Sequence, residues 1–126
     1  MKVGMYNAGA CGISQTFFVG TVNKNTDATK GTKLQVKLPA GFRLIDILID
    51  VKTAFASGTT LDISGDQKEP VKYVDAAKMD AVDFLEKDGK YASIGDGDVA
   101  LTAKLSTAET GEGSADIYAK VVRLEV

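Results

Sequence analysis

Hydrophobic and polar residues alternate through long stretches of this chain. Leu34, Val36 and Leu38 occupy every second position of the run that ends at Pro39-Ala40-Gly41. A period of two is typical of a β-strand with one buried face, and Gly or Pro stops such a strand. The pattern predicts about seven or eight strands, of which the clearest are 14–22, 32–38, 42–55, 60–64, 99–105 and 114–126, and 71–74 is a short strand candidate.

The alternation is strongest in residues 42–55, which define two contrasting faces. One face is predicted to be core, because most of its members are β-branched and apolar: Ile45, Ile47, Ile49, Val51 and Thr53. The other face mixes apolar with charged residues: Leu44, Asp46, Leu48, Asp50 and Lys52. A mixed face of this kind suits a subunit contact better than full exposure to water.

One short helix interrupts the predicted strands. Asp75 can cap a helix that begins at Ala76 and continues through Leu85, and Gly89 can end it. Many short strands with little helix favour an antiparallel architecture. We therefore predict an all-β fold, an antiparallel β-sandwich that is jelly-roll-like and has at most one short helix.

The amino-terminal segment differs from the rest of the chain. Residues 1–13 contain three glycines and show no sustained period of 2 or 3.6, which predicts an extended arm before a single sandwich domain at 14–126. The arm either lies along its own domain or reaches a neighbouring subunit. Met5 and Tyr6 are its candidate contact residues. Phe18, which follows Phe17 in the first predicted strand, is a further candidate.

Composition narrows the chemistry available to this chain. Its 126 residues are 44% hydrophobic, enough for one domain with its own core. The sequence contains no histidine and one cysteine, Cys11, which excludes Ser-His-Asp and Cys-His catalysis, a structural zinc site and an intrachain disulfide. We expect no enzymatic activity, no cofactor and no resident metal ion.

Charge and hydropathy exclude two classes of partner. The net charge is −2 and the two signs are interspersed, so no basic stripe is available for a nucleic acid. No stretch approaches the roughly 18 apolar residues of a membrane span, and the first residues lack the apolar core of a signal peptide. The sequence therefore predicts no nucleic-acid partner and no membrane partner. It predicts synthesis in the cytoplasm.

Carboxylates are the remaining candidates for chemistry. Asp46 and Asp50 share a strand face but lie roughly 13 to 14 Å apart, too far for a glycosidase pair. The run Asp96-Gly97-Asp98 resembles the start of a calcium loop, whose later acidic ligands are replaced by Ala100 and Thr107. Surface or interface charges, and an ordinary turn, are the simpler readings of these residues.

Several motifs resemble, in their order, those of small structural proteins of tailed bacteriophages. They are Leu38 to Gly41, the strand from Ile45 to Val51, Thr53 to Phe55, Gly58 to Ile63, Tyr73 to Ala77 and the closing strand Gly113 to Tyr118. The resemblance covers about residues 32–124. It implies a virion protein with a β-sandwich fold, a decoration or cement protein that binds the outside of the capsid shell, often as a trimer at threefold positions.

Three functions therefore compete. The first is capsid decoration, with the major capsid protein as partner, a homotrimer as assembly and Met5, Tyr6, Phe18, Leu44, Asp46, Leu48 and Asp50 as interface candidates. The second is a tail- or fibre-associated module that recognises a host-surface glycan through Tyr73, Tyr91 and Tyr118. The third is a carboxylate-based glycan hydrolase that uses Asp46 or Asp96.

Overall fold

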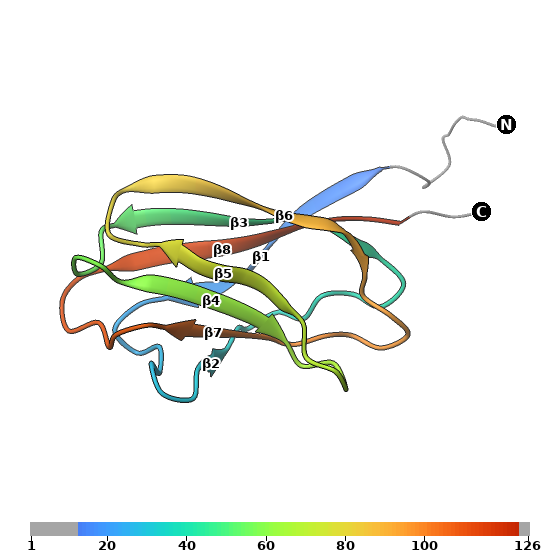
Figure 1. Cartoon of the computed structure of the whole chain (residues 1–126). Helices are drawn as coiled ribbons and strands as arrows, with labels where there is room; N and C mark the ends of the chain where they lie inside the picture. The colour runs from blue at the N-terminus through green and yellow to red at the C-terminus, as the bar shows by residue number, and fades with distance from the viewer. Residues whose placement is uncertain (1–12, 124–126) are drawn as a thin grey trace, which may run out of the picture.

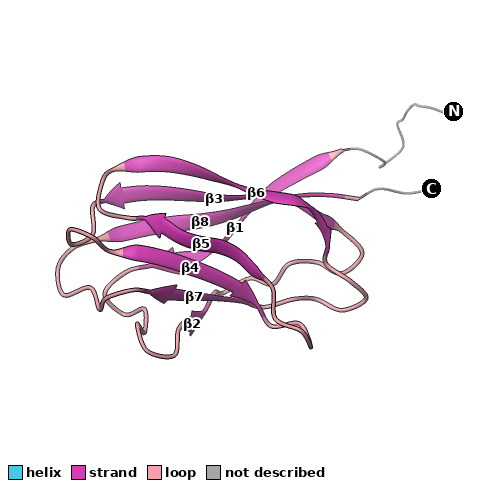
Figure 2. Cartoon of the chain, in the orientation of Figure 1, coloured by secondary structure: helices cyan, strands magenta, loops and turns pink. Residues whose placement is uncertain are grey.

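The structure is a computed structural model that describes residues 13–123, and within that range all regular elements are strands (Figure 2). The eight strands are β1 (Ser14–Val22), β2 (Thr32–Lys33), β3 (Arg43–Thr53), β4 (Thr60–Gly65), β5 (Lys72–Lys78), β6 (Asp83–Ser93), β7 (Leu101–Leu105) and β8 (Ser114–Val122). The predicted strands at 14–22, 60–64 and 99–105 are confirmed within a residue or two, and the closing strand is confirmed to Val122.

The strands form two antiparallel four-stranded sheets that face each other (Figure 1). One sheet has the order β1-β8-β3-β6 and the other β2-β7-β4-β5. Consecutive strands alternate between the sheets except at β4 and β5, and this is the connectivity of a jelly roll. The predicted all-β sandwich is therefore confirmed.

The core fills the space between the sheets. Every second residue of β8 from Ala115 to Val121 is fully buried, and its neighbours in between are half-buried on the outside. The largest side chains with almost no exposure come from both sheets and from the segments beside them: Leu38, Leu44, Ile47, Ile49, Leu61, Ile63, Met79, Leu101, Leu105, Ile117, Val19 and Val22. Two sheets about 10 Å apart interdigitate such side chains, which explains the period of two in the sequence.

The short helix predicted after Asp75 is wrong. Lys72–Lys78 forms β5 against β4, a turn follows, and Asp83–Ser93 forms β6 against β3. Asp75 belongs to an irregularity of β5 rather than to a helix cap. Local propensity favoured a helix, but long-range pairing buries Ala77 against Leu61, and such pairing overrides propensity.

The prediction that Leu44 shares a face with Asp46 is also wrong. The pairing of β3 shifts between these two residues on both its neighbours, so Leu44 points inward and is 0% exposed, while Ile45 is half-buried. Opposite Ile45, β6 has three residues where β3 has one, and Gly89 lies so close to Leu44 that a Cβ there would be 2.6 Å from Leu44 Cγ. A β-bulge inverts the alternation beyond it.

Residues 34–38 do not continue β2 as predicted but bridge the two sheets. The Leu34 and Leu38 N–H groups donate to Leu101 and Val99 of the second sheet, at 2.8 Å each, whereas the Val36 N–H donates to Val19 of β1 at 3.0 Å. Val36 is consequently 40% exposed instead of buried. This segment closes the side of the sandwich between β1 and β2.

Candidate functional site

Three of the predicted contact residues of β3 and Phe18 of β1 lie on one outer face of the sandwich. Asp46, Leu48 and Asp50 are half-buried and alternate with the core residues Ile47 and Ile49. Leu44 is buried and lies on the other side of the sheet. Met5 and Tyr6 fall outside the described residues.

Strand pairing orders this outer face into three rows, and we call it the acidic face. The rows run from β1 across β8 and β3 to β6: Thr16, Lys120, Asp46 and Asp88; Phe18, Tyr118, Leu48 and Glu86; Thr21, Asp116, Asp50 and Phe84. Sequence reasoning found four of these twelve residues as interface candidates. It missed those of β6, because that strand was assigned in part to a helix.

An apolar row crosses the middle of the acidic face. The rings of Phe18 and Tyr118 meet edge to face, with centroids 5.8 Å apart and planes inclined by 72°. Leu48 is the partner of Tyr118 on the next strand, and Phe18 remains 39% exposed. Aromatic pairs in this geometry add about 0.5–1.5 kcal/mol beyond their buried area, so this contact stabilises the apolar row.

Carboxylates flank the apolar row on both sides. Asp46 is directly opposite Asp88, and Asp50 is directly opposite Asp116. Like charges at paired positions destabilise a sheet unless a cation or a partner compensates them. Lys52 compensates Asp116 through a contact of 2.8 Å, and the hydrogen bond to Asp116 raises the pKa of the Lys52 ammonium above its usual value.

The outer face of the second sheet has the opposite character, and we call it the basic face. Its outward residues are Lys33, Thr102, Ser64 and Lys72 in one row, with Lys104, Asp62 and Asp75 beside them and Thr60 and Lys78 in the next row. These side chains are lysines, hydroxyls and two aspartates. No large apolar side chain occupies an outward position on these described strands.

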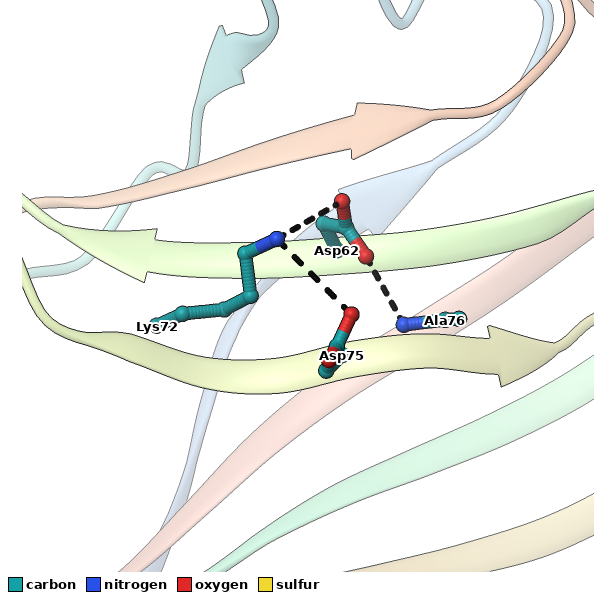
Figure 3. Close-up of polar contacts among 4 residues, drawn as sticks. All are labelled: Asp62, Lys72, Asp75 and Ala76. Atoms are coloured by element: carbon teal, nitrogen blue, oxygen red, sulfur yellow. Dashed lines mark hydrogen bonds and ion pairs between the residues drawn. The ribbon is translucent and has the colours of Figure 1, made fainter.

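Figure 3 shows how Lys72 is held on the basic face. Its Nζ lies 3.4 Å from Asp62 Oδ2 and 3.7 Å from Asp75 Oδ1. The other oxygen of Asp62 accepts a hydrogen bond from the Ala76 N–H at 2.8 Å, where Ala76 has a φ of 52°. This carboxylate therefore stabilises a left-handed backbone conformation that alanine rarely adopts.

Backbone distortions gather on the side of the sandwich formed by β5 and β6. In the described chain, the non-glycine residues with positive φ are Ala76 of β5 and Lys90 and Tyr91 of β6. Asp88 Oδ1 supports the second distortion by accepting the Lys90 N–H at 2.7 Å. Bulges of this kind disrupt the free edge of a sheet and hinder pairing with another strand.

Three grooves that are partly open to solvent mark the described surface. One of about 380 Å³ is lined by Ala76, Lys78, Asp80, Ala81, Asp83, Leu85 and Lys87. Another, of about 230 Å³, is lined by Val71, Lys72, Tyr73, Asp88, Gly89, Lys90 and Ala92. A third, of about 350 Å³, is formed by Asn23, Lys24, Thr53 and residues 111–114.

The three tyrosines predicted as possible glycan platforms have different surroundings. Tyr118 lies in the apolar row of the acidic face, and Tyr91 is 52% exposed on the bulge of β6. Tyr73 packs against the core and its hydroxyl is hydrogen-bonded to Gln67. Partial burial raises the pKa of the Tyr73 phenol, an effect that this hydrogen bond opposes.

The run Asp96-Gly97-Asp98 has a structural role in the loop before β7. Asp98 Oδ1 accepts the Ala40 N–H at 2.9 Å and so joins two loops that are far apart in sequence. Within residues 13–123 no three His, Cys, Asp or Glu side chains are grouped as metal ligands, and no helix there could cross a membrane.

No protein-family model matches the sequence, and no curated protein matches it either. A structural match does exist. The chain is similar to a chain of the solved structure described as "Cyanophage Pam1 capsid asymmetric unit". The TM-score is 0.66 with 16% sequence identity, and the match covers 99% of this chain and 94% of that one. At this identity the likeness establishes the shared fold.

Proposed function

We propose that this chain is a bacteriophage capsid decoration protein, which binds the outer surface of the assembled head and stabilises it. The observation that carries the proposal is the structural match to a chain of a phage capsid asymmetric unit over nearly the whole length of both chains. The match covers 99% of this chain and 94% of that chain, so the likeness is to the whole sandwich and not to a fragment of it. The motif order of residues 32–124 supports the same function independently.

The physical properties of the sandwich suit this role. The described surface offers partly open grooves and a broad sheet face with a packed aromatic pair, which favours adhesion over catalysis. A protein that binds only the assembled lattice stabilises it by mass action, and many symmetric contacts add up to high avidity. The partner is the major capsid protein, and the chain is made in the host cytoplasm before it joins the virion.

The proposed assembly on the shell is a homotrimer with closed heterologous contacts. Sedimentation equilibrium of the purified chain measures this directly, because a trimer has three times the 13.3 kDa of one chain. A species of 13.3 kDa at all concentrations, both free and eluted from shells, would contradict the trimer without affecting the decoration role.

Shell binding tests the decoration role. Heads of the phage that encodes this chain are prepared from a deletion strain and incubated with the purified protein. We expect the protein to sediment with the heads, to form ordered protrusions in cryogenic images and to raise the temperature at which the heads open. Heads that bind none of the protein, or wild-type virions that lack it, would refute the proposal.

A further inference from the structure

The two outer faces of the sandwich carry opposite charge. On the acidic face, five carboxylates (Asp46, Asp50, Glu86, Asp88 and Asp116) are accompanied by three cationic groups at or beside it (Arg43, Lys52 and Lys120), a balance of −2. On the basic face, four lysines (Lys33, Lys72, Lys78 and Lys104) accompany two aspartates (Asp62 and Asp75), a balance of +2. The net charge of −2 for the whole chain conceals this polarity.

Apolar side chains follow the same division. Phe18, Leu48, Phe84 and Tyr118 all lie on the acidic face, and Phe18 and Phe84 are 39% and 50% exposed. The outward strand positions of the basic face hold no comparable side chain. An apolar centre within a charged surround is the usual anatomy of a protein–protein interface.

We propose that the acidic face is the docking surface of this protein and that its occupant is a basic patch of the capsid shell protein with an apolar recess at its centre. The basic face then points away from the shell. This inference rests on the proposed function and adds to it the orientation of the molecule and the chemistry of its partner surface.

Charge complementarity selects this occupant. Asp46 is paired with Asp88 and Asp50 with Asp116, and Lys120 and Lys52 balance these carboxylates only in part. Lysines or arginines from a partner would complement the remaining negative charge. The basic face of a second copy is a poorer occupant, because it offers no apolar group to cover Phe18 and Leu48. Stacking copies through opposite faces would also give an open filament rather than a closed assembly.

The test is binding of the full chain to heads prepared without it, measured as the half-saturating concentration. The main variant is the double substitution Asp46→Lys with Asp50→Lys. Its matched control on the opposite face is Lys33→Glu with Lys104→Glu. Leu48→Ala tests the apolar row separately, and thermal melting of every variant verifies that it remains folded.

We expect the double lysine variant to bind at least about tenfold more weakly, because complementary charges become like charges. The control pair should stay within about threefold of the wild type, since solvent-facing charges contribute little. Wild-type binding should weaken when salt rises from about 0.05 to about 0.5 M, and the double lysine variant should lose most of this dependence. Leu48→Ala should weaken binding by about tenfold at every salt concentration, because it removes buried apolar area.

Three outcomes would overturn the inference. If the folded double lysine variant binds as tightly as the wild type, the acidic face is not the docking surface, although the decoration role stands. If the control pair loses binding instead, the molecule is oriented the other way. Heads that bind no wild-type protein would refute the proposed function itself and this inference with it.

Discussion

Glu109 holds two loops together at the end of the sandwich that lies away from Ser14, and its removal should destabilise the fold. The side chain is only 7% exposed. One carboxylate oxygen accepts the Ala56 N–H at 3.2 Å, and the other accepts the Gly113 N–H at 2.9 Å. These bonds join the loop after β3 to the loop before β8, so Glu109→Ala would leave both N–H groups without their acceptor.

The size of the effect follows from the burial of these two groups. A buried donor without an acceptor costs about 1–3 kcal/mol. The bond to Gly113 is buried and counts in full, whereas the bond to Ala56 is only partly buried and water replaces part of it. We therefore expect Glu109→Ala to lower the free energy of unfolding by about 2–4 kcal/mol. For a domain of this length that corresponds to a fall in Tm of roughly 8–16 °C.

Urea denaturation followed by circular dichroism measures this loss, with two companion variants. Glu109→Gln keeps one acceptor oxygen, so its free energy of unfolding should lie between those of the wild type and Glu109→Ala. Glu112→Ala removes an exposed glutamate from the same loop and should stay within about 0.5 kcal/mol of the wild type. If Glu109→Ala and Glu112→Ala unfold at the same urea concentration, the two hydrogen bonds do not stabilise the loops as argued.

Three further predictions follow from the same structure. Gly89→Ala should lower the free energy of unfolding by about 2–4 kcal/mol, because its Cβ would lie 2.6–2.7 Å from atoms of the buried Leu44. Gly97→Ala, which has open space around it, should leave the free energy of unfolding unchanged in the same urea assay. Ile47→Ala should lower the free energy of unfolding by about 2–5 kcal/mol, because Ile47 is fully buried. Leu48→Ala, at the outward-facing neighbour, should lower it clearly less, and equal losses would contradict the assignment of faces. The N–H groups of Thr29 and Lys30 hold the pKa of Asp27 below its ordinary value of 3.8, so its contribution to stability is present above pH 3.8 and is lost as the pH falls through the lower folded pKa. The difference in urea midpoint between wild type and Asp27→Asn should accordingly shrink in strong acid, and a constant difference across pH would contradict it.

The candidate docking face shows how far sequence reasoning reached. The period of two placed Asp46, Leu48 and Asp50 together on one side of β3, because that rule holds along a regular strand. It failed for Leu44 because the β-bulge depends on Gly89, which is 45 residues later in the chain. The period of two could not place Phe84 on this face, because the fold topology decides which strand pairs with β3.

The sequence alone also could not predict that the two faces carry opposite charge. Composition showed both signs interspersed along the chain and a net charge of −2. Acidic residues of β3, β6 and β8 come together only because these strands are neighbours in one sheet, while Lys33, Lys72 and Lys104 belong to the other. A sum over the sequence cannot separate two faces whose members alternate along the chain.

The sequence by itself determined that this protein is a β-sandwich without histidine-based chemistry, because a period of two and composition are local or additive properties. Tertiary structure alone decided that residues 75–89 belong to the edge strands β5 and β6 and the turn between them, and that Leu44 is buried in the core. It also decided that one face is acidic and apolar while the other is basic. These features arise from contacts between residues distant in sequence, and pairing energy there exceeds the local preferences that a sequence displays.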